Sequence, residues 1–325
     1  MRPLLPRRGL LAAPLILPAA ALAQGEWPSR PVRIVVPYPP GGGLDVLCRA
    51  MADRLSVVWR QPVTVDNRPG GATIPGTDQV AKAAPDGHTL LMTSDSSITS
   101  NPHLGARLPH DPMRDLVPVS YLLDVHQMVL VHPSVGARDM AGLVAAAKAA
   151  PGRLNYGSYG PGSQPNLLFD GLRAREGTQI QAVTYRGVGP AVLATVQGEV
   201  QMTLSGIASS RDALADGRIV ALAVGRPTRF PQLPDVPTLD EAGYGELDPR
   251  TWFGLFAPAG TPAALLSRIQ RDAAAALDEP LIRDRHLTAN GYTVHAATPE
   301  ASLAMVAADF EAKRRLVRLA GVRAE

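Results

Sequence analysis

Two glycine-rich turns, each lying between a strand pattern and a helix pattern, constrain the fold of this chain most. The β-rich run PVRIVV (31–36) is followed by Gly41, Gly42 and Gly43, and an amphipathic run then predicts a helix that Asp45 caps. The run RLNYGS (153–158) leads in the same way into a glycine-rich turn and a helix. Glycine is entropically costly wherever the chain is ordered, so we expect this bare backbone to have a use.

The same alternation of strand and helix patterns extends through the whole chain. Strands are predicted at 31–36, 61–65, 88–93, 128–133, 153–158, 180–185, 199–204, 217–225 and from 251. Helices are predicted after Asp45, at 76–84, 140–152, within 159–175, at 188–198, and over a long region after 262. This alternation predicts two α/β units, each with a mostly parallel sheet flanked by helices.

The first 23 residues predict an export signal. Arg7 and Arg8 precede an apolar stretch (9–23) that is too short to span a bilayer, and ALA (21–23) forms a small-x-small cleavage site. An N-terminal membrane anchor is the alternative, and the arginine pair leaves a twin-arginine route open. We expect a periplasmic protein that is cleaved near Ala23.

Removal of that segment changes the charge of the protein. It takes away three arginines and no acidic residue, so the formal net charge of +3 falls to zero for the remaining 302 residues. A neutral chain has no electrostatic reason to bind nucleic acid or an anionic membrane surface. No later stretch is apolar and long enough for a membrane helix. We therefore expect a soluble monomer with one large domain or two ordinary ones.

Cys48 is the only cysteine, so no internal disulfide is possible. A lone thiol in an oxidising compartment is either a reactive group or a small buried hydrophobe. Its neighbours Leu47, Met51 and Leu55 lie on the apolar side of the predicted helix, which favours the buried role.

The glycine-rich turns suit an anion, because they expose backbone N–H groups at the positive end of a helix dipole. A dinucleotide fingerprint would need its last glycine at Val46, and a P-loop would need a lysine that is absent here. The remaining candidate is a small carboxylate held by main-chain amides. A tight turn that only lets strand and helix pack is the alternative. Two such turns in two α/β units favour binding, because facing turns would form a cleft.

Motifs for catalysis and for metal binding are missing from the sequence. Ser158 and Ser205 would each need a glycine two residues earlier to form a nucleophile elbow, but those positions hold Tyr156 and Thr203. The seven histidines show neither H-x-H nor H-E-x-x-H spacing, so we predict no metal site and no cofactor. An enzyme assembled from distant residues stays open as an alternative.

Two further turns follow strands and carry polar side chains. In TYRGVGPA (184–191), Tyr185 is a hydrogen-bond donor, and Arg186 is either the partner of a ligand carboxylate or a solvated surface cation. SDSS (94–97) supplies hydroxyl groups, although Asp95 would repel a ligand carboxylate if it faced one.

Several segments, taken in order, resemble the successive motifs of one protein family. They are WPSRPVRIVVPYPPGGGLDV, VTVDNRPGGA, AAPDGHTLLM, LNYGSYGPGSQPNLL, YRGVGPAVLATVQGEV, RIVALAVGRPTRFPQLPDVPTLDEAGY and WFGLFAPAGTP. From Trp27 nearly to its end, the chain resembles the Bug family of extracytoplasmic solute receptors, the binding proteins of tripartite tricarboxylate transporters. Each motif is weak alone, and their order makes the match specific.

The resemblance implies an α/β periplasmic-binding-protein fold, a type II-like Venus flytrap of two lobes joined by crossover strands. One lobe would comprise residues 24–125 and 250–325, and the other residues 126–249, with the ligand in a cleft between the lobes. Main-chain amides and waters from two loops would hold the carboxylate of the ligand. The resemblance also implies that membrane permease subunits receive this ligand.

Carried over to this sequence, the expected ligand-binding residues lie in five segments. They are Tyr38, Pro40, Gly41, Gly42, Gly43, Asp45, Ser94, Asp95, Ser96, Ser158, Tyr159, Gly160, Ser163, Asn166, Tyr185, Arg186, Gly187, Ser205 and Gly206. The ligand would be a dicarboxylate or tricarboxylate, an aromatic carboxylate or an amino acid.

The chain departs from the family pattern at four places. Asn166 stands where a histidine is usual, Asp95 lies in a loop that is usually small and uncharged, and Gln201 replaces a common aspartate. The stretch EAKRRLVRLAG (311–321) lacks the usual tryptophan. We interpret Asp95 and Asn166 as a pair that accepts an amino or amide group, which indicates a zwitterion rather than a plain polycarboxylate.

The sequence thus predicts a receptor that closes on a small organic carboxylate and presents it to a permease. A receptor of the same shape that reports its ligand-bound state to a signalling partner is the alternative. The sequence does not separate the two, because they differ in the partner.

Overall fold

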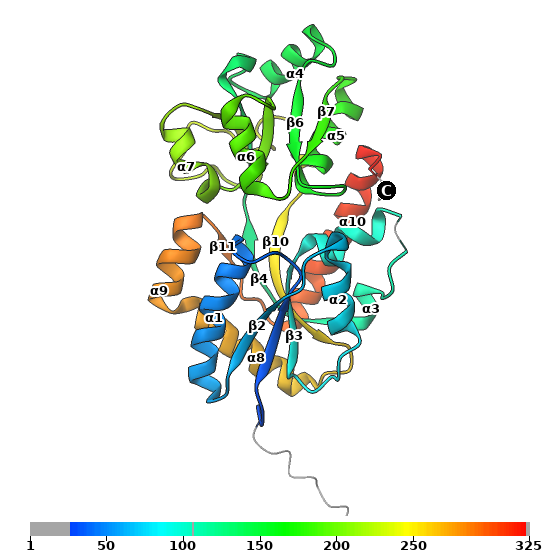
Figure 1. Ribbon diagram of the computed structural model, residues 1–325, viewed down its shortest axis with the longest axis vertical. Coiled ribbons are helices and arrows are strands. Elements are labelled where there is room, and N and C mark those ends of the chain that lie inside the picture. Colours follow the sequence, from blue (N-terminus) through cyan, green and yellow to red (C-terminus); the bar gives the residue numbers. More distant parts are fainter. Residues whose placement is uncertain (1–26, 106, 323–325) are drawn as a thin grey trace, which may run out of the picture.

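The structure is a computed structural model that describes residues 27–105 and 107–322. The predicted export signal lies outside these residues. The described chain forms two β-sheets with helices around each, and these are the two lobes that Figure 1 shows one above the other. Within the described residues, no helix combines the length and the apolar character that crossing a membrane requires.

The first sheet has six strands in the order β11-β4-β10-β3-β1-β2. Its strands are β1 (Val32–Val36), β2 (Val63–Asn67), β3 (Thr89–Ser94), β4 (Leu116–Val125), β10 (Thr251–Pro258) and β11 (Thr293–Val294). β1 is parallel to β2 and β3, whereas β10 is antiparallel to β3 and β4. The expectation of a mostly parallel sheet is therefore wrong, because β10 enters this sheet from the other lobe.

The second sheet has five strands in the order β7-β6-β8-β5-β9. Its strands are β5 (Met128–Val131), β6 (Asn155–Ser158), β7 (Gln181–Thr184), β8 (Met202–Ser205) and β9 (Val220–Val224). β6 is parallel to β7 and β8, and β5 is antiparallel to β8 and β9, so this sheet is mixed as well. Only His126 and Gln127 separate β4 from β5, so the chain crosses between the sheets there.

The helices follow the strands largely where the sequence predicts them. Their bounds are α1 (Gly43–Trp59), α2 (Ile74–Ala81), α3 (Pro112–Asp115), α4 (Met140–Ala149), α5 (Gln164–Glu176), α6 (Val188–Gln197), α7 (Ile207–Ala215), α8 (Ala263–Asp278), α9 (Pro280–Ile282) and α10 (Pro299–Ala320). The predicted helices at 76–84, 140–152 and 188–198 are confirmed within a few residues. β4, β11 and α7 were not predicted.

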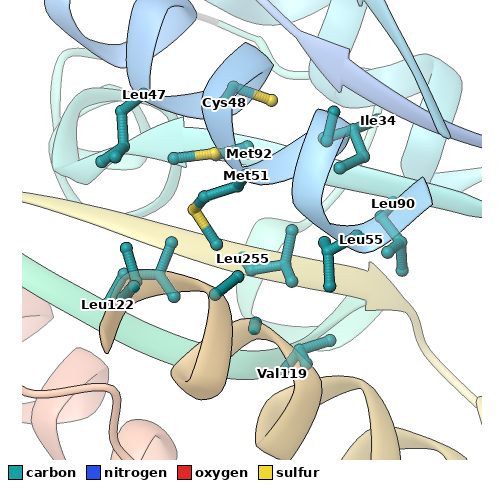
Figure 2. Close-up of a cluster of buried hydrophobic side chains, with 14 of the residues drawn as sticks. Ile34, Leu47, Cys48, Met51, Leu55, Leu90, Met92, Val119, Leu122 and Leu255 are labelled. Atoms are coloured by element: carbon teal, nitrogen blue, oxygen red, sulfur yellow. The ribbon is translucent and has the colours of Figure 1, made fainter. Parts of the chain in front are cut away.

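The core of the first lobe lies between α1 and its sheet. Leu47, Met51 and Leu55, which the helical spacing places on one face, are buried together with Leu255 of β10 (Figure 2). Cys48 is fully buried beside them, and burial raises the pKa of its thiol well above the usual range. The interpretation of Cys48 as a small buried hydrophobe is confirmed.

The C-terminal helix α10 packs against both lobes. Val306, in its first half, belongs to the same buried cluster as Trp252 of β10. Leu316, near its end, belongs to the cluster around Phe169 in the second lobe. Figure 1 shows α10 in red, passing beside β10 toward α5. The division of the chain at 125/126 and 249/250 stays a proposal, and the strands of the two sheets fall on either side of it.

Candidate functional site

The first glycine turn leads from β1 into α1 with an open backbone. Pro40 and the three glycines are exposed, and a methyl group at Gly41 or Gly42 would have no atom within 4 Å. Gly41 has a φ of 89°, a left-handed conformation that favours glycine. α1 begins at Gly43, and no side chain caps its N-terminus. Its first N–H groups therefore have no partner within the helix and are available to a ligand.

Asp45 supports this turn instead of capping the helix, and this corrects the sequence prediction. The helix begins before Asp45, and its carboxylate reaches back to accept the Gly41 amide at 2.8 Å and the Asn67 amide group at 2.8 Å. It also pairs with Arg49 at 3.1 Å. Burial alone would raise the pKa of Asp45, but these three partners together hold it below its usual value. The side chain is occupied within the protein, so only its backbone N–H faces the open end of the helix.

The second glycine turn joins β6 to α5 in a similar way. Ser158 ends β6, Gly160 has a φ of 121°, and α5 begins after Ser163 with no side-chain cap. The hydroxyl groups of Ser158 and Ser163 both donate to Oδ1 of Asn166, from Ser163 at 3.0 Å. The amide group of Asn166 donates to Tyr156 at 3.1 Å. Asn166 therefore holds its own turn together.

Asp95 follows β3 and is completely buried. Its carboxylate lies 2.7 Å from Nζ of Lys313 and accepts Nε2 of Gln164 at 3.2 Å. Burial raises the pKa of Asp95 to about 6 against the lowering effect of Lys313. Protein groups already engage both side chains, which counts against the interpretation of Asp95 and Asn166 as a joint acceptor for a ligand amine.

The residues around Asp95 bring the two glycine turns together. Tyr38, in the first turn, shares a hydrogen bond of 2.7 Å with the hydroxyl of Ser94. Gln164, the first residue of α5, donates to Ser96 at 3.4 Å as well as to Asp95. The turn before α1 and the first residue of α5 therefore both contact residues at the end of β3 or just after it.

The remaining predicted residues line the same edge of the second sheet. β6, β7 and β8 are parallel, so the turns that follow them lie side by side. Gly187 and Gly206 precede α6 and α7, which start without a side-chain cap. Ser205 is buried, and Tyr185 is half-buried. Among the described residues, side-chain caps occur at α3, α4 and α10.

Two of the predicted residues differ in their surroundings. Tyr159 is half-buried, and its hydroxyl donates to Gln127 at 3.4 Å, at the crossing between the sheets. Arg186 is exposed and forms no ion pair within the described residues. The structure thus leaves both of its predicted roles open, the ligand partner and the solvated cation.

Tyr292 lies at the first turn and was not among the residues predicted from the sequence. A methyl group at Gly43 would be 3.0 Å from the Tyr292 hydroxyl oxygen. Its ring packs edge-on against Phe253, with ring centroids 5.9 Å apart. Burial raises the pKa of Tyr292 to about 12, so its hydroxyl remains a donor near neutral pH. No local pattern identifies it, because it comes from a turn far along the chain.

The arrangement can do one kind of chemistry well, which is to hold an anion by backbone amides. Four helices with uncapped N-termini, α1, α5, α6 and α7, each follow a strand and begin in the turn after that strand. Within the described residues, no three side chains of metal-ligating type lie close enough to share a metal ion.

Comparison with known proteins identifies the family. Residues 47–322 match the family model described as "Tripartite tricarboxylate transporter family receptor", TctC. The chain belongs to the TctC family. Protein BugT of Bordetella pertussis is 33% identical over 306 residues, which cover 94% of this chain and 94% of BugT. The resemblance to Bug receptors is thus confirmed.

Solved TctC-like structures share the two-lobed fold. R. palustris Rpa4515, solved with adipate, is 30% identical with a TM-score of 0.82 over 92% of this chain and 100% of Rpa4515. MatC from Rhodopseudomonas palustris, solved with bound malate, is 28% identical with a TM-score of 0.79 over 90% of this chain and 100% of MatC. TctC proteins are substrate-binding receptors and not enzymes, which removes the enzyme alternative.

Proposed function

We propose that this TctC receptor binds a small organic dicarboxylate or tricarboxylate between its lobes in the periplasm. It would present this ligand to the membrane permease of a tripartite tricarboxylate-type transporter. The observation that carries the proposal is that α1 and α5 both begin, uncapped, at glycine-rich turns whose residues Tyr38 and Gln164 contact the end of β3 and the loop after it. Such N-termini attract negative charge.

Backbone amides suit this task because they are fixed in place before the ligand arrives. Gly42 and Gly43 leave the start of α1 free of side chains, and the carboxylate of Asp45 holds the turn in shape. A hydrogen bond to a charged group contributes about 1.5–3 kcal/mol, so a few amides account for micromolar binding. Closure of the lobes would add to this by excluding water.

The ligands in the related structures support the carboxylate class. Rpa4515 was solved with adipate and MatC with malate, and both are dicarboxylates. The occupied side chains of Asp95 and Asn166 remove the main reason to expect an amino group on the ligand. We therefore place plain carboxylates ahead of amino acids.

The test begins with the ligand that the protein carries. Native mass spectrometry of the freshly purified receptor should release a small carboxylic acid. A thermal-shift panel of adipate, malate, citrate, benzoate and glutamate should then give stabilisation by at least one plain carboxylate. At a hundredfold excess over Kd the expected gain is about 2.7 kcal/mol, or several degrees in Tm. A panel in which none of the plain carboxylates stabilises the protein, or only glutamate does, would reject the proposal.

A further inference from the structure

Two charged side chains that are 218 residues apart in sequence meet in the folded chain as one buried ion pair. Lys313 lies on α10, and its Nζ lies 2.7 Å from the carboxylate of Asp95. Lys313 is 1% exposed and Asp95 is fully buried. Burying two charges is costly, and a hydrophobic pair is often as stable, so such a pair calls for a role beyond stability.

Lys313 lies where the connections between the lobes converge. Besides Asp95, its ammonium group donates to the backbone carbonyls of Pro249 and Arg250, at 2.7 Å for Arg250. These residues immediately precede β10, where the chain returns from the second lobe to the first. Arg250 has a φ of 42°, a left-handed conformation that is strained for a residue with a side chain. Lys313 therefore fixes the crossing segment.

The carboxylate of Asp95 bonds to residues of both lobes. Oδ2 accepts Lys313, and Nε2 of Gln164 donates to Oδ1 at 3.2 Å and to Oδ2 at 3.4 Å. Gln164 is the first residue of α5 and is 5% exposed, so this contact fastens the second glycine turn to the first lobe. The end of α10 packs against α5, so an opening that moves α5 away from α10 would break the contact with Gln164 and leave the pair with Lys313 in place.

We propose that the Asp95–Lys313 ion pair is the fixed half of a closure latch, which Gln164 engages when the lobes close. The three residues position the second glycine turn without touching the ligand. The inference rests on the proposed function for its ligand, although the latch itself is tested without one.

The charged surroundings of Asp95 make the latch sensitive to pH. The titratable groups that face this cluster are Lys313 and Asp309 of α10, Asp248 of the crossing segment, and Tyr38, Tyr121 and Tyr159. Burial raises the pKa of Asp95 to about 6. Burial would lower the pKa of Lys313, but Asp95 and Asp309 outweigh it, so Lys313 stays charged. As pH falls through about 6, Asp95 loses its charge, and the bond from Gln164 loses its charge assistance.

Lobe closure is measured first on the ligand-free protein. Val57 and Leu193 are 69% and 55% exposed, on α1 and α6, and cysteines placed there accept a pair of fluorescent dyes while Cys48 stays buried. Energy transfer then reports the ratio of closed to open molecules at about pH 7.5 and about pH 5, on either side of the Asp95 pKa. We expect Gln164→Met to lower this ratio roughly tenfold at the higher pH, and to remove its pH dependence. Gln197→Met, at the exposed end of α6, is the matched control and should change neither the ratio of closed to open molecules nor its pH dependence.

The ion pair is tested by removing both charges together. Asp95→Asn with Lys313→Met removes both charges of the pair, which costs less than removing one alone, and urea unfolding first checks that the double variant folds beside the buried Asp309. We expect it to match Gln164→Met, with a lower closed ratio and a flat pH profile. Lys148→Met, which removes an exposed lysine, is its control. A double variant that keeps the wild-type ratio and pH profile would overturn the proposal, as would a wild-type ratio that is constant across this pH range.

Adipate and malate binding provides the second readout. Calorimetry should show affinity for the bound probe roughly tenfold weaker in Gln164→Met than in the wild type at about pH 7.5. Equal affinity in the two proteins would contradict the latch. If no carboxylate binds the wild type, the proposed function fails, and the energy-transfer measurement still decides on the latch.

Discussion

Gly162, in the second glycine turn, lies directly against Leu104 of the loop that follows β3. A methyl group at Gly162 would collide with the Leu104 side chain, which is 2% exposed. Gly162 also has a φ of 71°, in the left-handed region. Glycine is thus required there by the close approach of the two segments as well as by its own conformation.

This contact predicts an effect of Gly162→Ala that exceeds ordinary backbone strain. The alanine should cost the strain of a left-handed residue plus a collision, together about 2–4 kcal/mol of unfolding free energy. Gly152→Ala is the matched control, because Gly152 has a φ of 74° with open space around it. Urea unfolding of both variants measures the difference. Adding Leu104→Ala should recover part of the loss in Gly162→Ala, and equal costs in the two single variants would show that the contact is unimportant.

The first turn predicts a loss of binding without a loss of folding. Gly43 is exposed and does not have a positive φ, so Gly43→Val should leave the Tm of the ligand-free protein within a few degrees. The valine side chain would cover the uncapped start of α1, and its Cβ would press on the Tyr292 hydroxyl oxygen, 3.0 Å away. We expect no thermal shift with any carboxylate that stabilises the wild type. Ala141→Val, in the exposed first turn of α4, is the control, and undiminished binding by Gly43→Val would exclude this turn as the site.

Asp45 predicts a stability difference that depends on pH. Its folded pKa is lowered, so its contribution is fully present above the pKa of the unfolded chain and is lost as pH falls through the lower folded value. Asp45→Asn should therefore cost about 1–3 kcal/mol of unfolding free energy near neutral pH and less near about pH 3. Urea unfolding at both pH values measures this. Asp53→Asn, exposed on the same helix, is the control, and a cost for Asp45→Asn that is unchanged in acid would contradict the assigned role.

The sequence predicts local features of this protein better than contacts between distant residues. The strand at 31–36, the glycine turn and the apolar face of α1 follow from spacing that extends over a few residues. The local pattern did not reveal β4, because its Pro118 argues against a central strand. In the fold, β4 nevertheless pairs with β10 and β11. Strand direction was missed as well, because it depends on where the chain returns from the other lobe.

The roles of charged side chains were the least predictable part. Asp45 resembles a helix cap in sequence, but the backbone turns at Gly41 and allows its carboxylate to reach backward. Asp95 was expected to face the ligand. Its actual partner, Lys313, is 218 residues away in the sequence and could not be recognised from local spacing. A long-range ion pair leaves no trace in local spacing, so only the folded chain shows that this charge is already compensated.

Cys48 predicts a thiol that stays unmodified as long as the protein is folded. Burial raises the pKa of the thiol well above its usual range, and the thiolate is the reactive form, so almost none is present near neutral pH. Iodoacetamide should therefore leave the native protein unlabelled and react with one thiol once urea unfolds it. Val57→Cys, on the exposed face of the same helix, should be labelled in the native state. Native labelling of Cys48 at a similar rate would mean that α1 separates from the first sheet, and the turn at its N-terminus would then be too mobile to hold a ligand by fixed amides.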